Sequence, residues 1–252
     1  KSKAPTELRI RMYRVGFGDF FLISIPDGDG YQHIIVDCGV FTGTSGKGDI
    51  GTIKTAVAHM ADEVNKTGGG RIAMIIVTHR HKDHIIGFSR CEKIFLDFKH
   101  KVDAIWMPLW EAETDKAKGF QASLEKASYD IGNAALALGA DGSDYYDEIL
   151  DYMENATGFS FKEAKAKAEG KGGGTNGRSM EILKGELGVK PRYYARGDKG
   201  KLPESLTRLG LTAEILSPPP LDEMEFLKLE DLKQGVGQYF GADGKPKSTG
   251  AK

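Results

Sequence analysis

The stretch RIAMIIVTHRHKDH, residues 71–84, decides the fold. Its first half is an almost unbroken apolar run ending at Thr78, which is typical of a strand buried on both faces of a sheet. Its second half places three histidines and one aspartate within six residues, 79–84. Loops at strand ends commonly hold the active sites of α/β proteins. The sequence therefore predicts a functional site where this strand ends.

The residue types of this loop indicate metal binding. Imidazole nitrogen and carboxylate oxygen are the ligands of catalytic zinc. Alternate residues of an extended segment point the same way, so His79 and His81 can share one metal ion. Asp83 and His84 follow the turn and can reach a second ion, and such a pair of ions favours hydrolytic chemistry. A merely charged surface loop would have to collect half of the chain's six histidines by chance.

The residues before this stretch read as a meander of strands. ELRIRMYRV (7–15) alternates apolar and polar residues, as a half-buried strand does. FFLISIP (20–26) and HIIVDCG (33–39) are further strands, and DGDG (27–30) between them is typical of a hairpin turn. We therefore expect three consecutive strands at one edge of a sheet.

A helix and a further strand complete the first part of the chain. Apolar residues recur at helical spacing over 50–64, which gives a strand–helix–strand unit with the strand at 71–78. DAIWMPL (103–109) reads as another strand. The chain is therefore predicted to be an α/β protein, in which residues 7–110 form the N-terminal part of a layered domain.

The remaining residues change character. The region 111–188 is rich in Ala, Lys, Glu and Asp and poor in strand formers, so we expect a helical insertion or cap. Strand patterns return at 190–196 and 211–217, and we assign 189–240 to the sheet domain again. Residues 241–252 have the composition of a flexible tail.

Two segments resemble a known family. THRHKDH (78–84) resembles the HxHxDH signature of the metallo-β-lactamase superfamily, and residues 13–39 are similar to the opening of its ComEC-like branch. The resemblance implies an αββα layered sandwich, of which the first half is present, and two bound zinc ions, or Mn or Fe in their place. It assigns His79 and His81 to one ion and Asp83 and His84 to the other.

The same resemblance suggests roles for individual residues. Asp83 would also hold the attacking nucleophile in line, and Asp37 would orient the ligand loop through hydrogen bonds without binding metal. Gly39 would let the backbone turn beside it. Asp19 and Trp110 could line the site. For Asp19, hydrogen bonding within a turn is the alternative, and for Trp110 it is core packing.

The chain also departs from the family pattern. The family carries further ligands after this motif, including an aspartate at a later strand end and a final histidine. His100 is the only histidine after His84 and comes too early, whereas Asp198 in ARGD lacks the apolar strand expected before it. We therefore expect the C-terminal half of the fold, with the remaining ligands, to lie in a longer parent protein.

Composition excludes several classes. Lys plus Arg number 35 and Asp plus Glu 36, so no overall charge draws the chain to nucleic acid or to an anionic membrane. Apolar runs fall short of the roughly 20 residues of a membrane helix. The N-terminal residues lack a secretory signal, and two cysteines suit a reducing compartment. We expect a cytoplasmic protein without a membrane partner.

These observations predict a metal-dependent hydrolase that uses a metal-activated water. The family resemblance favours a phosphodiester or nucleic-acid substrate, or a small molecule with another ester-type bond. A lactonase or thioesterase is the alternative within the enzymes. From another class, the chain could be a catalytically incomplete metal-binding module that acts within a complex. A bridging aspartate and a late histidine distinguish an enzyme from such a module.

Overall fold

The computed structural model describes residues 4–41, 51–137, 144–168 and 175–221. The tail predicted at 241–252 lies outside these residues, as does Ile50 at the start of the predicted helix.

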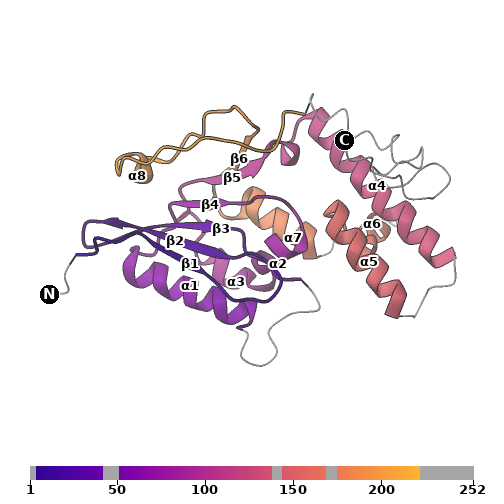
Figure 1. The fold of residues 1–252 in the computed structure, drawn as a ribbon, viewed down its shortest axis with the longest axis horizontal. Coiled ribbons are helices and arrows are strands. Elements are labelled where there is room, and N and C mark those ends of the chain that lie inside the picture. Colours follow the sequence, from indigo (N-terminus) through magenta and orange to yellow (C-terminus); the bar gives the residue numbers. More distant parts are fainter. Residues whose placement is uncertain (1–3, 42–50, 138–143, 169–174, 222–252) are drawn as a thin grey trace, which may run out of the picture.

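The centre of the fold is a mixed β-sheet, whose strands follow one another in chain order (Figure 1). Its first three strands are antiparallel and the later ones run parallel to the third. The strands are β1 (Arg9–Met12), β2 (Phe21–Asp27), β3 (Gly30–Val36), β4 (Met74–Ile76), β5 (Ile105–Pro108) and β6 (Arg192–Tyr194). Together with the helices below, this sheet confirms the α/β class and is consistent with a β-lactamase-like α/β sandwich.

The predicted hairpin joins β2 to β3. Asp27 is paired with Gly30, so the turn has only two central residues. The first of these, Gly28, has a φ of 57°. Two-residue hairpins whose twist matches the strands need this left-handed backbone, which glycine adopts without steric cost.

Apart from the short helix α8, the described helices lie on one face of the sheet and at one end of it. The helices against the sheet are α1 (Ile53–Thr67), α2 (Lys82–Arg90), α3 (Glu92–Leu96) and α7 (Thr175–Glu181), which continues into a π-helical turn, Ile182–Glu186. A short 3₁₀ turn, Leu109–Glu111, follows β5 and leads to α4 (Asp115–Ala137), α5 (Asp144–Thr157) and α6 (Phe161–Ala168). Helix α8 (Glu204–Thr207) follows β6.

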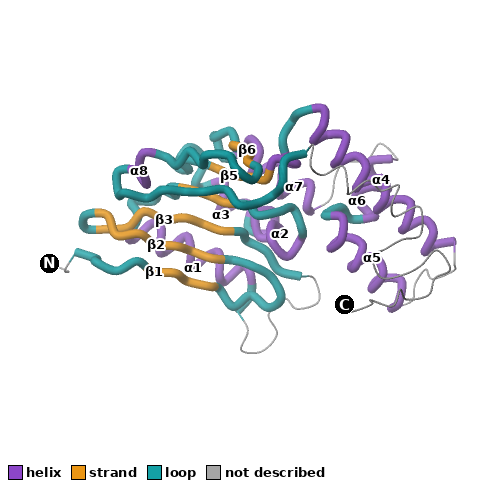
Figure 2. The backbone as a smooth tube through the Cα atoms, turned by 45° about the horizontal axis from the view of Figure 1, so that its top comes forward, coloured by secondary structure: helices purple, strands orange, loops and turns teal. Residues whose placement is uncertain are grey.

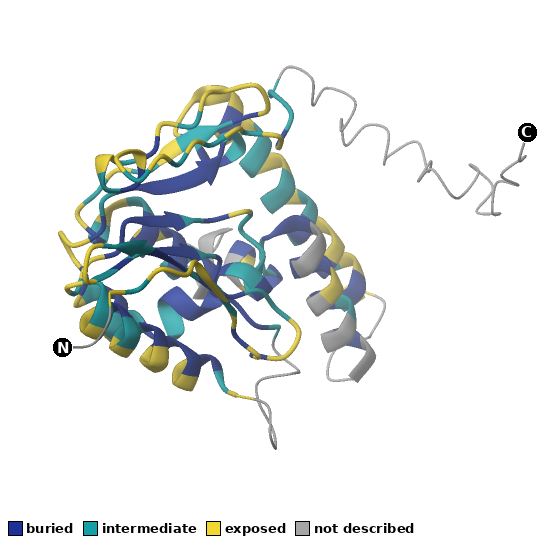
Figure 3. Ribbon diagram, turned by 60° about the vertical axis from the view of Figure 1, so that its left-hand side comes forward, coloured by how far each residue is buried: buried dark blue, intermediate teal, exposed yellow. Residues whose placement is uncertain are grey.

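The main core lies between the sheet and α1, α2, α3 and α7. Leu22, Ile35, Ile75 and Ile105 point from successive strands to this face and are fully buried. Burying one such side chain contributes roughly 1.5–3 kcal/mol. Helix α1 offers a matching apolar stripe, whereas its outer face is exposed (Figure 3). The layered arrangement thus follows from the strand and helix periodicities seen in the sequence.

The other face of the sheet is only partly covered. Ile34 and Trp106 belong to a second core there, which Leu202 and Leu206 complete from the segment after β6. Figure 2 shows this segment crossing the sheet mostly as loop, with α8 within it. The predicted strand at 211–217 is wrong, because only an isolated bridge pairs Glu214 with Lys199 and the apolar residues of this stretch pack on the second core.

The predicted helical region 111–188 contains two different parts. Helices α4, α5 and α6, with the residues that join α5 to α6, form what we call the helical module (115–137 and 144–168), which has its own small core around Leu150 and Phe161. In contrast, Ile182 and Leu183 are buried in the main core. The stretch after the helical module therefore belongs physically to the sheet layer.

His33 is fully buried between strand and helix and provides a test of this core. Its ring nitrogens lie 3.0 Å from the Ser24 hydroxyl and 2.9 Å from the Thr67 hydroxyl. Burial lowers the pKa of His33 from 6.5 to about 4. These contacts give His33 a structural role between β3 and α1.

We predict that His33 makes the fold sensitive to acid. Above pH 6.5 the imidazole is neutral in both states, so its contribution to stability is complete. As the pH falls towards 4, the unfolded chain takes up the proton first, and unfolding should become easier by up to about 1.4 kcal/mol per pH unit. Urea unfolding of the parent and of His33→Gln from pH 7 to 4 measures this. A stability difference between the two that stays constant over that range would contradict it.

Candidate metal centre

Residues 77–81 connect the end of β4 to the start of α2, and we call them the ligand loop. Val77 continues the strand by donating its amide to the carbonyl of Trp106, and the amide of Thr78 then turns to the carboxylate of Asp37, at 2.8 Å. Helix α2 begins at Lys82, directly after His81. The loop is therefore short and held at both ends, by a sheet on one side and a helix on the other.

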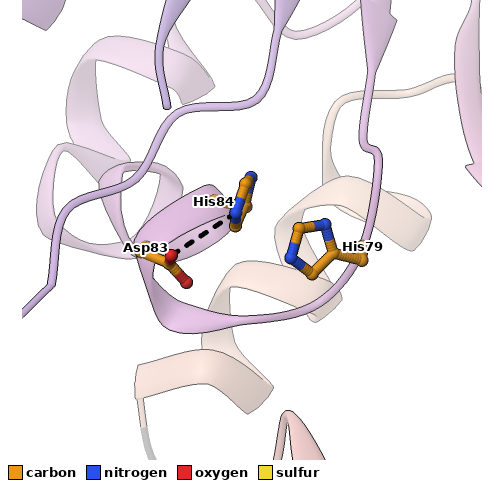
Figure 4. A group of neighbouring side chains, drawn as sticks. All are labelled: His79, Asp83 and His84. Atoms are coloured by element: carbon orange, nitrogen blue, oxygen red, sulfur yellow. Dashed lines mark ion pairs between the residues drawn. The ribbon is translucent and has the colours of Figure 1, made fainter. Parts of the chain in front are cut away.

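The side chains of His79, Asp83 and His84 converge at this strand end (Figure 4). One ligand atom from each lies within 4.8 Å of the others. The ring centroids of His79 and His84 are 3.7 Å apart, and His81 packs edge-on against His79 at 4.5 Å. The structure thus gathers all four predicted ligands, but groups His79 most tightly with Asp83 and His84 instead of with His81.

The carboxylate of Asp83 is buried and only partly satisfied by polar contacts. The residue is buried, and its Oδ2 lies 3.4 Å from Nε2 of His84. Its other oxygen, Oδ1, is buried without a hydrogen-bond partner. Leaving such an atom unsatisfied costs about 1–3 kcal/mol, and more for a charged group. A cation held between Asp83, His79 and His84 would satisfy this oxygen, so the residues present fit a metal ion.

Asp37 ties the ligand loop to β3. Its carboxylate accepts hydrogen bonds from the amide of Thr78 at 2.8 Å, from the Thr78 hydroxyl at 2.5 Å and from Nδ1 of His84 at 2.9 Å. The residue is 2% exposed and has a φ of 52°, which aspartate tolerates better than most residues. These contacts are those of a residue that orients the loop, and the expectation that Asp37 does so without binding metal remains a prediction.

The three histidines of the motif differ in protonation, because the pKa of His84 is raised whereas those of His79 and His81 are lowered. Burial alone would lower the pKa of His84, but hydrogen bonds to Asp37 and Asp83 and their charges outweigh it and raise the pKa to about 9. For His81, burial and the neighbouring His79 lower the pKa to about 4. Burial and His84 likewise lower the pKa of His79. At neutral pH, His79 and His81 are therefore free to donate a nitrogen lone pair, whereas His84 carries a proton.

Two glycines bring the start of α2 against β3. A Cβ at Gly39 would collide with the backbone of Asp83 and His84, and one at Gly18 would lie 2.9 Å from the carbonyl oxygen of Asp83. The amide of Asp19 donates to this same carbonyl at 3.0 Å. Gly39 is thus required for close approach, and this replaces the backbone turn expected from the sequence.

Of the two residues predicted to line the site, Asp19 lies next to His84, whereas Trp110 packs against a helix. The carboxylate of Asp19 lies 3.5 Å from Nδ1 of His84 and is 44% exposed, so it borders the ligands. Asp19, Asp37 and His84 also form a second group whose ligand atoms lie within 4.8 Å of one another. Trp110 lies in the 3₁₀ turn after β5, where its ring packs against Phe120 of α4 at 6.3 Å. Its packing favours the structural alternative.

The later residues considered as ligands have local roles. The carboxylate of Asp198 accepts the amide of Ala195 at 2.7 Å and closes a turn. His100 has a φ of 63° and its ring lies against Gly188. Sequence reasoning missed the neighbours of the ligands, Arg80 and Lys82, which contact the helical module. The signal available was that both are cations inside a metal-binding motif.

Similarity to known proteins is found among solved structures alone. No protein-family model matches the chain, and no curated protein matches it. Among solved structures, the chain is similar to a β-lactamase domain protein from Burkholderia ambifaria, with 19% sequence identity and a TM-score of 0.33. The match covers 79% of this chain and 45% of that chain, so this chain spans under half the length of its match.

Among the described residues, no helix is both long enough and apolar enough to cross a bilayer.

We predict that Asp37→Asn changes the charge state of His84 in the metal-free chain. Asparagine keeps the size of the side chain and tolerates the left-handed backbone, but it removes the negative charge and the strongest acceptor of Nδ1. The pKa of His84 should fall from about 9 towards 6.5. NMR titration of the histidine ring protons measures it, with His59 of α1, which contacts Tyr13 and no proposed ligand, as an internal reference. A pKa that remains near 9 would show that Asp37 is not responsible.

Proposed function

We propose that this chain is a metal-dependent hydrolase of the metallo-β-lactamase type, related to the ComEC-like branch. The observation that carries the proposal is the convergence of His79, Asp83 and His84 within 4.8 Å, with an unsatisfied buried oxygen on Asp83. His81, whose ring packs on His79, is the fourth proposed ligand. The proposed cofactor is zinc, as two ions, with Mn or Fe as substitutes.

The side chains divide the proposed work among themselves. When bound, zinc supplies an activated water and polarises the scissile bond. His79 and His81 would bind the metal through neutral rings. Asp83 would bind the metal as well, and would also orient the attacking water. Asp37 holds Nδ1 of His84, which directs Nε2 towards Asp83 and His79. Asp19, at the exposed border of the site, is accessible to a substrate.

The proton on His84 makes metal binding depend on pH. A histidine must lose its proton before the ring nitrogen can bind a metal. With its pKa raised to about 9, His84 releases a proton on binding at neutral pH, so metal affinity should increase as the pH rises from 7 to 9. The neighbouring His79 and His81, with lowered pKa values, add little to this dependence.

The proposed substrate class is a phosphodiester, including nucleic acid, or another ester-type bond. The near balance of charges gives the chain no overall attraction to nucleic acid, so a small phosphodiester or a single strand end fits better than long duplex DNA. Lactone or thioester hydrolysis is the alternative chemistry at the same ligands. A metal-binding module without activity of its own, placed in the cytoplasm, is the alternative from another class.

We predict that the purified chain retains about one to two metal ions. Elemental analysis of the parent should find zinc, manganese or iron, and His79→Ala with His81→Ala should lose it. His59→Ala with His100→Ala is the matched control, because it removes two exposed histidines and should leave the metal content unchanged. Absence of metal from the parent, or equal content in both double variants, would refute the proposed metal centre.

A second measurement distinguishes the enzyme from the inactive module. The metal-loaded chain is assayed with bis(p-nitrophenyl) phosphate, an aryl lactone and an acyl thioester. Hydrolysis that disappears in the His79→Ala, His81→Ala variant identifies the bond type. Full metal content with no turnover of any probe would favour the incomplete module and contradict the hydrolase.

We further propose that another layer of the fold covers the open face of the sheet. On β1, the side chains of Ile10 and Met12 are 65% and 66% exposed and share this face with Ile23 and Phe21, their partners on β2. An alternating exposed apolar edge is a liability that proteins normally cover. A second sheet, contributed by the C-terminal half of a longer parent protein, would cover it and supply the remaining ligands.

We predict that Ile10→Lys with Met12→Lys has little effect on the stability of this chain and a large effect on that of a longer parent protein. In this 252-residue chain the free energy of unfolding should change by no more than about 0.5 kcal/mol, because both side chains are exposed. In a parent protein with the second layer, two buried charges should cost several kcal/mol. Urea unfolding of both measures this, and equal effects in the two proteins would contradict the proposed layer.

A further inference from the structure

The ligand loop also contacts the helical module, through the residues that lie between and after the ligands. Arg80 separates His79 from His81, and Lys82 separates His81 from Asp83. Arg80 lies next to Gly158, the residue after α5, as does the ring of His81. It faces α5 and the residues that join α5 to α6, which lie at the end of the sheet nearest the ligand loop (Figure 1).

Arg80 is held in place by two kinds of contact. Its guanidinium carbon lies 4.0 Å from the centre of the Phe159 ring, within the range of a cation–π interaction. Its Nε lies 3.5 Å from a carboxylate oxygen of Glu111, which is fully buried in the 3₁₀ turn after β5. Lys184 approaches the other oxygen of Glu111 at 3.6 Å. Arg80 thus joins the helical module to a buried charge cluster.

Two further contacts join the ligand loop and the start of α2 to the helical module. Nζ of Lys82 lies 3.4 Å from the carboxylate of Glu154 on α5, and both side chains are largely buried. Gly158, which follows α5, has a φ of 71°. A Cβ there would lie 2.5 Å from Cγ of Arg80 and 3.2 Å from Cδ2 of His81. The backbone of the helical module is therefore in direct contact with a proposed ligand, with no room for even a methyl group.

We propose that Arg80 is a positioning residue, through which the helical module fixes the ligand loop in its metal-binding conformation. This inference rests on the proposed function, because it concerns the affinity of the same metal site. Because Arg80 lies between His79 and His81 in the chain, anchoring its side chain restricts the backbone that carries both histidines. By thermodynamic linkage, a module that favours metal binding must itself be stabilised on the sheet domain by the metal, to the same extent.

The sharpest test pairs two glycine variants. Gly158→Ala introduces the conflict with Arg80 and His81, and should weaken zinc affinity at least tenfold in a chelator competition titration of the whole chain. Gly210→Ala is the matched control: its φ of 81° imposes a similar backbone strain, but nothing lies within 4 Å of the added methyl. The control should lose only the thermal stability that the backbone strain costs, and should keep zinc affinity within about twofold.

A milder variant covers the case in which Gly158→Ala does not fold. Phe159→Leu keeps an apolar side chain of similar volume but removes the ring beneath Arg80, and zinc affinity should fall at least threefold. Hydrogen exchange of α5 provides a second readout. Saturating zinc should slow exchange in α5 of the parent chain, and this protection should be reduced in Phe159→Leu by the same factor as the affinity.

The outcomes separate the inference from the proposed function. Zinc binding by the parent with equal affinity in Gly158→Ala and Phe159→Leu would overturn the positioning role and leave the metal centre intact. Zinc that does not bind to the parent chain would overturn both. Weakened binding in these variants, with unchanged binding in Gly210→Ala and zinc-dependent protection of α5, is the expected result.

Discussion

The carboxylate of Asp37 is the interaction on which the rest of the candidate site depends. It stands just after β3, in a left-handed backbone conformation, and binds both the start of the ligand loop at Thr78 and the far end of the motif at His84. A buried carboxylate is stable only when charge and hydrogen bonds compensate for its lost hydration. The fold provides that compensation from the ligand loop itself. The geometry of the loop and the burial of Asp37 therefore depend on each other.

Close backbone packing makes this arrangement possible. Gly39 lies two residues after Asp37 and lets the first turn of α2 approach β3 until their backbones are in contact. Helix α2 supplies Asp83 and His84, so the distance between strand and helix sets the distance between Asp37 and His84. A larger residue at Gly39 would separate the two halves of the centre, even though it touches no proposed ligand side chain.

Sequence reasoning predicted the local part of this site and missed its surroundings. The strands, the hairpin and the position of the ligand loop follow from periodicity and turn chemistry, which act between near neighbours. The extra strand at 211–217 failed because an apolar alternation also suits a loop lying across a sheet, and only the partner strands distinguish the two. Likewise, alternation along the loop paired His79 with His81, whereas the start of α2 brings His84 closer.

The contacts of Arg80 could not be predicted, because they join four segments that are far apart in the sequence. Glu111 comes from the 3₁₀ turn after β5, Phe159 from a connection within the helical module, and Lys184 from the π-helical turn after α7. Buried ion pairs add little stability compared with apolar packing of the same volume, since desolvation offsets most of their attraction. What they contribute is direction, because a guanidinium between a carboxylate and a ring has few alternative positions. A cation between two ligand histidines therefore specifies which way the ligand loop faces, and an apolar residue at the same place would leave that choice open.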